Sequence, residues 1–325
     1  MIEVSNLTKE FNGIKAVDNI SFSVKKGETF VLLGTSGCGK TTTLKMINRL
    51  VEPTSGEMRI EGRKTLEEEP TKLRKQIGYV IQNIGLFPHY TVEQNIAVVP
   101  QLLKWDRNRI RNRTNELLEL VGLVPPEEFL KRHPGELSGG QQQRVGLARA
   151  FAADPSIILL DEPFGALDPI TRRQIQKEFK KLEMMLAKTI ILVTHDIFEA
   201  FDLADRICLM DEGRVKQIGT PKKLLFSPKK KFVKDFFRSN RFLLELKVIP
   251  LKDLLPVISD TGIRDETLPK FEESKSLLDV LETMESSKDP KSAFRIMDSA
   301  EKIKKVTTHK DALEAFLKIR LKMTA

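Results

Sequence analysis

The stretch TFVLLGTSGCGKT, residues 29–41, decides the fold. Its first five residues are apolar or β-branched and predict a buried strand, Thr29–Leu33. Gly34 to Thr41 then have the spacing of a phosphate-binding loop, and a helical pattern follows. Glycines let backbone N–H groups curl around an anion, which the positive end of the helix dipole also favours. We expect Lys40 to reach the β and γ phosphates and the Thr41 hydroxyl to bind Mg²⁺.

Similar apolar runs elsewhere predict further strands, and amphipathic stretches between them predict helices. Strands are expected at Ile2–Val4, Ile20–Val24, Met58–Ile60, Ile77–Ile81, Ile157–Leu160, Ile190–Val193 and Ile207–Met210. Helices are expected at Thr41–Leu50 and Arg172–Leu186. This alternation predicts an α/β fold with a mostly parallel sheet and helices on its faces.

The pattern changes twice along the chain. Val92 to Leu137 is helical without buried-strand runs, which predicts a helical subdomain, and Arg109–Leu120 is its clearest amphipathic stretch. A lysine-rich run then ends a first domain of residues 1–240. The remaining residues, 241–325, predict a small α+β domain, with helices at Ser276–Met284 and Lys310–Arg320 and strands at Phe294–Met297 and Ile303–Val306.

Composition narrows the class of protein. The 325 residues are 40% hydrophobic and 30% charged, the balance of a soluble globular protein. No apolar run approaches the about 18 to 20 residues that span a membrane, and the N-terminus lacks a secretory pattern. We therefore expect a cytosolic protein, in which Cys38 and Cys208 stay reduced.

The net charge of +9 raises nucleic acid or an anionic membrane as partners. From Arg241 onward 16 basic residues face 15 acidic ones, so the excess lies before that point. Much of it gathers between Lys222 and Arg238, in a run more typical of a solvated surface linker. We expect no nucleic-acid partner.

Two strands end in side chains that complete a nucleotide site. Ile157–Leu160 leads into Asp161 and Glu162. In α/β sheets ligands bind beyond the carboxyl ends of strands, so Asp161 is expected near the metal and Glu162 beside the γ-phosphate, where it orients or deprotonates water. His195 follows the strand Ile190–Val193. A structural role is open to it, but we favour a γ-phosphate contact.

Leu137-Ser138-Gly139-Gly140-Gln141 opens another helix, Gln142–Ala153. Its hydroxyl and bare backbone N–H groups predict a second anion-binding helix terminus. The chain thus has two γ-phosphate cradles but one lysine-bearing loop. The simplest solution is a homodimer in which each ATP lies between the loop of one subunit and Ser138 of the other.

Over about residues 1–240, the order of these motifs resembles the ATP-binding-cassette (ABC) family, to which Gln82 after Ile77–Ile81 and the segment from Gly165 to Asp168 add. The resemblance implies a P-loop NTPase cassette with a mixed sheet core, using ATP and Mg²⁺. It implies that Gln82 touches Mg²⁺ or the attacking water and senses a membrane partner, and that Asp168 contacts the opposite subunit. Phe11 matches the aromatic that stacks on adenine, although a core role is open to it.

The predicted site has three groups of residues. The nucleotide contacts are Phe11, Gly34, Thr35, Ser36, Gly37, Cys38, Gly39, Lys40, Thr41, Thr42, Ser138, Gly139, Gly140, Gln141 and Asp168. The catalytic residues are Glu162, His195 and Gln82, and the metal ligands are Thr41, Gln82 and Asp161.

The stretches Gly85–Ile96 and Gln142–Val145 are similar to bacterial importer cassettes. The stretch Val80–His89 is especially similar to the cassettes of glycine betaine, choline and carnitine importers. This implies an ATP-hydrolysing subunit on the cytoplasmic face of the membrane, with integral membrane permease subunits and, indirectly, a solute-binding protein. An importer of another small solute such as methionine stays open, as does a cassette ATPase acting on nucleic acid. Leu277–Arg320 is similar to one degenerate regulatory module of the cystathionine-β-synthase type.

Overall fold

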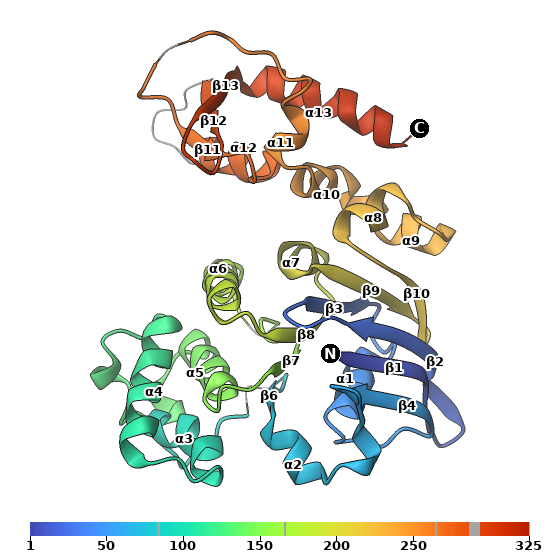
Figure 1. Cartoon of the computed structure of the whole chain (residues 1–325), viewed down its shortest axis with the longest axis vertical. Helices are drawn as coiled ribbons and strands as arrows, with labels where there is room; N and C mark the ends of the chain where they lie inside the picture. The colour runs from blue at the N-terminus through green and yellow to red at the C-terminus, as the bar shows by residue number, and fades with distance from the viewer. Residues whose placement is uncertain (83–84, 166, 264, 286–292, 325) are drawn as a thin grey trace. The chain divides into compact units, whose positions relative to one another are not determined.

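The structure, a computed structural model, describes residues 1–82, 85–165, 167–263, 265–285 and 293–324 (Figure 1). The chain folds as two compact units, Met1–Ile218 and Gly219–Ala325. None of the helices in the described ranges has the length and apolar character needed to cross a bilayer.

Two sheets form the frame of the first unit. An antiparallel sheet has the strand order β2-β1-β4-β5, with β1 at Ile2–Phe11, β2 at Ile14–Val24, β4 at Ser55–Ile60 and β5 at Arg63–Lys64. A second sheet has the order β10-β9-β3-β8-β7-β6, with β3 at Thr29–Gly34, β6 at Ile77–Val80, β7 at Ile157–Asp161, β8 at Thr189–Thr194, β9 at Arg206–Asp211 and β10 at Arg214–Gly219. The pairs within β9-β3-β8-β7-β6 are parallel, as the alternating pattern predicts.

Seven α-helices are described in this unit: α1 at Lys40–Ile47, α2 at Pro70–Lys75, α3 at Val92–Leu102, α4 at Arg107–Leu120, α5 at Gly139–Phe151, α6 at Pro169–Leu186 and α7 at Ile197–Leu203. Figure 1 shows α3, α4 and α5 gathered to one side of the sheets. Thr91 caps α3 through a reciprocal capping box with Gln94, which fixes where this helical group begins.

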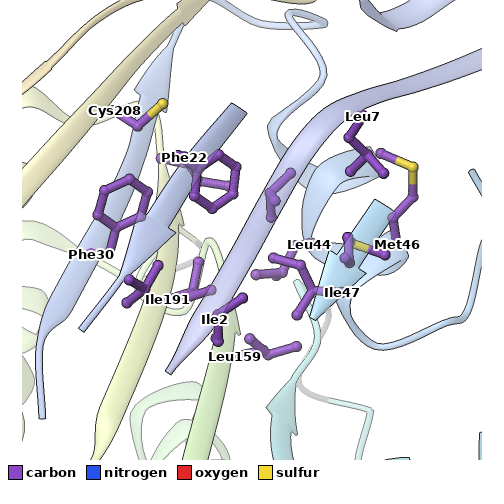
Figure 2. Packing of buried hydrophobic residues seen from close by; sticks show 14 of the residues in the cluster. Ile2, Leu7, Phe22, Phe30, Leu44, Met46, Ile47, Leu159, Ile191 and Cys208 are labelled. Atoms are coloured by element: carbon purple, nitrogen blue, oxygen red, sulfur yellow. The ribbon is translucent and has the colours of Figure 1, made fainter. Parts of the chain in front are cut away.

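The main core lies between the two sheets (Figure 2). Ile2 and Leu7 from β1, Phe22 from β2 and Leu44 from α1 meet side chains of the parallel strands, among them Phe30. Phe22 and Phe30 stack with their ring centroids 5.2 Å apart. Because α1 is anchored in this core, the loop that precedes it has a fixed end point.

The second unit holds its own core. Its helices are α8 at Pro221–Phe226, α9 at Lys231–Phe236, α10 at Arg241–Val248, α11 at Leu251–Leu254, α12 at Leu277–Glu285 and α13 at His309–Thr324. Its sheet has the order β11-β12-β13, with β11 at Lys270–Glu272, β12 at Ala293–Met297 and β13 at Ile303–Thr308. The helix-strand-strand-helix order predicted between Leu277 and Arg320 is present.

The sequence predicts a division near residue 240, whereas the compact units divide after Ile218. The reason is that α8 packs with the second unit: Arg241 donates to the Leu225 carbonyl over 3.2 Å, and Lys222 pairs with Asp253 at 2.7 Å. The lysine-rich run therefore belongs to a folded segment rather than to a linker.

Glu245 ties α10 to α13 in the second unit. Its side chain is fully buried and accepts from Arg241 Nε over 2.7 Å and from Arg320 Nε over 2.5 Å. Removing one partner of such a buried ion pair destabilises the fold, because the other partner is left as a buried charge without compensation.

We predict that Glu245→Ala lowers the free energy of unfolding of the second unit by about 2–3 kcal/mol, because two guanidinium groups lose their buried acceptor while keeping some solvent access. Hydrogen exchange of the full-length chain measures this as faster exchange of β12 and α13 amides. Glu314→Ala, at an exposed position of α13, is the control. Equal protection in both variants would contradict the prediction.

Candidate nucleotide-binding and hydrolysis site

The loop between β3 and α1 needs two of its glycines. At Gly39, which has φ +98° and precedes α1, an added Cβ would lie 2.3 Å from the Ala16 carbonyl oxygen. At Gly34 it would lie 2.1 Å from the Met210 carbonyl oxygen. Since backbone cannot give way as a side chain tip can, both positions exclude other residues.

Lys40 holds the loop from inside. Its side chain is buried, and Nζ donates to the Gly34 and Thr35 carbonyl oxygens, each over 2.9 Å. The Thr35 hydroxyl donates to Asp211 Oδ1 over 3.0 Å, which fastens the loop to the end of β9. Burial raises the pKa of the Cys38 thiol in this loop, so it stays neutral.

Thr41 and Asp161, which the sequence predicts as metal ligands, lie next to each other. The Thr41 hydroxyl donates to Asp161 Oδ1 over 2.8 Å. Asp161 is 2% exposed, and its burial raises the pKa of the carboxyl despite the Thr41 bond and the nearby lysines. A buried carboxylate beside a hydroxyl, with little else to neutralise it, fits a small hard cation that is also held by phosphate oxygens and water.

The other two predicted catalytic side chains, Gln82 and His195, both contact Glu162. Gln82 Nε2 donates to Glu162 Oε2 over 3.2 Å, and His195 Nδ1 lies 3.2 Å from the same oxygen. The backbone of Glu162 has φ +47°, a costly conformation for a residue with a side chain, and its N–H donates to the Val193 carbonyl over 2.9 Å. This bond to β8 therefore fixes the backbone from which the Glu162 carboxylate extends.

Arg172 links the segment before α6 to the turn that carries His195, a role that no sequence pattern predicts. Its guanidinium donates to the carbonyls of Phe164 and Leu167, over 3.1 and 3.0 Å, and lies 3.5 Å from Asp196. No motif marks these contacts, because they join residues from different elements.

Asp168 caps α6, accepting from the Ile170 and Thr171 N–H groups over 3.1 and 3.0 Å. A side-chain hydrogen bond with Thr171, together with these backbone bonds, lowers the pKa of the Asp168 carboxyl, so it stays charged. Ala166, between Gly165 and Asp168, lies outside the described residues.

Ser138 and Gln141 bond with each other rather than with the loop. Ser138 Oγ accepts from the Gln141 N–H over 3.3 Å, and the Gln141 side chain accepts from the Ser138 N–H over 2.9 Å. Both Ser138 and Gly139 are exposed. Among the described residues, no hydrogen bond joins this capping box to residues 34–42 of the same chain.

Phe11 lies at the end of β1 with 45% of its surface exposed, and Lys9 Nζ is 4.8 Å from its ring centroid. A core role is therefore excluded. The β1–β2 hairpin that carries it also places Ala16 against Gly39, so the ring belongs to the element that borders the loop.

The chain is similar in sequence to known proteins. The family described as "ABC transporter" matches residues 17–165. The glycine betaine uptake system ATP-binding protein YehX of Escherichia coli is 51% identical over 254 residues, which are 78% of this chain and 81% of that protein. The chain belongs to the ABC transporter family.

The glycine betaine/carnitine/choline transport ATP-binding protein OpuCA of Bacillus subtilis is 53% identical to this ABC cassette over 244 residues, 75% of the chain. The match spans 64% of OpuCA's own length. A solved structure, the ATP-binding cassette MJ0796 as a dimer bound to ADP and Pi, is 37% identical. It covers 68% of this chain and 98% of its own, with a TM-score of 0.61, which confirms the predicted fold class.

We predict that Gly39→Ala in this ABC cassette lowers the affinity for Mg·ATP at least about tenfold, because the new Cβ pushes the loop away from Ala16. Equilibrium binding of a fluorescent ATP analogue measures the change. Gly37→Ala is the matched control: it has φ +74° and thus shares the strain, but an added Cβ meets nothing within 4 Å. Equal losses in the two variants would show that strain, and not the close approach, matters.

Proposed function

We propose that the chain is the ATP-binding and ATP-hydrolysing subunit of an ABC importer. The observation that carries this is the convergence on Glu162, within 3.2 Å, of Gln82 and His195, next to the Thr41–Asp161 pair. A carboxylate placed beside the metal ligands and the phosphate loop suits activation of a water molecule.

In the proposed mechanism the residues of the site bind the phosphates, hold the metal and activate water. Backbone N–H groups of the loop and Lys40 bind the phosphates, Glu162 orients or deprotonates the attacking water, and His195 donates to the γ-phosphate. Gln82 keeps Glu162 aligned, since its amide donates to Glu162 Oε2, the oxygen that His195 also approaches. Thr41, Asp161 and Gln82 would hold Mg²⁺, which neutralises charge on the phosphates when bound.

We propose that two copies sandwich two nucleotides. Support comes from the exposed first turn of α5, where Gly139 and Gly140 leave N–H groups without intrahelical partners. The solved relative is itself described as dimeric. Asp168, which is exposed, charged and at the start of α6, is proposed to contact the opposite copy.

The membrane partner is proposed to dock in a groove of about 330 Å³ beside Gln82. Tyr79, Phe87, Val98, Val99 and Arg149 line it, between β6 and helices α3 and α5. Phe87 is 41% exposed and packs on Tyr90, with ring centroids 5.3 Å apart. An apolar groove with an aromatic rim suits a short amphipathic helix of a permease subunit. Such docking implies attachment to the cytoplasmic face of the membrane.

The transported solute is proposed to be a quaternary amine of the glycine betaine, choline or carnitine type, because OpuCA and YehX are named for such solutes. The cassette itself never touches the solute. Reconstitution with its membrane and solute-binding subunits, and a comparison of ATP hydrolysis stimulated by glycine betaine or methionine, separates the two solutes. The second unit is proposed to be a regulatory region, which its separate core supports.

We predict that Glu162→Gln lowers kcat for ATP hydrolysis at least about 100-fold, because the amide cannot accept the proton of the attacking water. ATP binding should stay within about twofold, and a dimer should accumulate with ATP in size-exclusion chromatography. A Glu162→Gln protein that retains hydrolysis, or that stays monomeric with bound ATP, would contradict the assignment.

We predict that Phe87→Glu leaves basal ATP hydrolysis intact but reduces assembly with the permease subunits at least about tenfold, because a charge replaces the aromatic rim of the groove. Co-purification with those subunits measures assembly. Leu102→Glu, an exposed apolar position at the far end of α3, is the control. If both variants assemble normally, the groove is not the docking surface.

A further inference from the structure

Glu199 is a buried acid behind the turn that carries His195. It lies in α7 and is 5% exposed. Its Oε2 lies 2.5 Å from the hydroxyl of Thr194, the last residue of β8. Among the described residues, Glu199 Oε1 has no hydrogen-bond partner. The proposed mechanism gives this carboxyl no task.

The Thr194 hydroxyl is the link between Glu199 and the turn. Its oxygen accepts from the Asp196 N–H over 3.0 Å, which closes the turn around His195. Asp196 in turn caps α7 by accepting from the Phe198 and Glu199 N–H groups, over 2.8 and 3.2 Å. The backbone that carries the His195 imidazole is therefore held by hydrogen bonds among Thr194, Asp196 and Glu199.

This network favours a neutral carboxyl. A buried carboxylate is costly to ionise when only one of its oxygens accepts a hydrogen bond. A neutral Glu199 avoids this cost and keeps its hydrogen bond with the Thr194 hydroxyl. Burial raises the pKa of Glu199 to about 8, the negative charges of Asp196 and Glu162 add to the rise, and the Thr194 bond and Arg172 oppose it.

Charged or titratable groups surround Glu199 on several elements. Asp196 and His195 lie in the turn before α7, Glu162 follows β7, and Arg172 comes from α6. The strands β3 and β8, which α7 packs against, carry no titratable side chain. Arg172 is already engaged with Asp196 and with the carbonyls of Phe164 and Leu167.

We propose that Glu199 is a positioning residue for ATP hydrolysis: its neutral carboxyl, bonded to Thr194, holds the turn so that His195 stays beside Glu162. The proposal rests on the proposed function of the site. Ionisation would add a negative charge near Asp196 and Glu162, and its solvation requires the turn to open. Hydrolysis should then fall as the pH rises through about 8.

The test compares four forms of the full-length chain between pH 6.5 and 9.5. In the unmodified protein, kcat should fall about tenfold per pH unit well above the pKa, with ATP affinity nearly constant. Glu199→Gln should keep kcat within about twofold at pH 7, because its amide oxygen can accept from the Thr194 hydroxyl as the carboxyl oxygen does, and should lose the alkaline fall. Thr194→Val should lower kcat at least about tenfold at every pH without a matching loss of ATP affinity.

Glu183→Gln is the matched control. The Thr29 hydroxyl donates to Glu183, burial raises the pKa of that carboxyl as well, and Thr29 begins β3 at the opposite end of the parallel strands from Thr194. Its pH profile should match that of the unmodified protein. An alkaline fall that persists in Glu199→Gln, or a Glu199→Gln protein that binds ATP but is inactive at pH 7, overturns the proposal.

A second measurement does not depend on hydrolysis. An unfolded glutamate ionises near pH 4.5 and folded Glu199 near pH 8, so between these values the folded chain holds a proton that the unfolded chain lacks. The Tm of Glu199→Gln relative to the unmodified protein should therefore rise from pH 5 to pH 8 and then level off. A constant difference would show that Glu199 is ionised in the fold. Loss of hydrolysis in every form, with this Tm pattern intact, would count against the proposed function alone.

Discussion

The close approach of three chain segments at the phosphate loop is the constraint on which the rest of the site depends. Gly39 touches the backbone of β2 through Ala16, and Gly34 touches the backbone of β9 through Met210. The loop is thus clamped between the two sheets, and no side chain can be inserted at either glycine. Lys40 and Thr41 take their directions from this clamp, because α1 starts directly after it and is anchored in the core.

The order of the strands determines which side chains meet at the site. Within the parallel sheet, β8 lies between β3 and β7, so the loop, the turn of His195 and the Asp161-Glu162 pair leave the sheet side by side. The sequence allowed the residues of this edge to be predicted, because each follows an apolar strand. The strand neighbours themselves follow only from the structure, since local pattern does not determine which strands pair.

Other features had no local signal. The strand β10 carries alternating polar residues at the edge of its sheet, so its pattern is too weak to predict. The segment from Gly219 to residue 240 reads as a charged linker, yet Leu224, Leu225 and Val233 are buried there. Lysine and arginine side chains can bury their aliphatic stems and form ion pairs through their charged ends, and such contacts produce no apolar periodicity in the sequence. The contacts of Arg172 and Glu199 join different elements, so no local pattern predicts them.

Four acidic side chains, Asp161, Glu162, Asp196 and Glu199, crowd the end of β7 and β8, where a triphosphate would add more negative charge. The structure limits their charge in different ways. Arg172 pairs with Asp196, and burial raises the pKa of Asp161 and Glu199. Glu162 is partly exposed, and its carboxylate accepts from Gln82 and lies beside His195. Since like charges within a few ångströms oppose one another, keeping Glu199 neutral leaves Lys40 and a metal fewer charges to balance when phosphate arrives. Control of proton occupancy behind the site is therefore part of how the cassette tolerates its substrate.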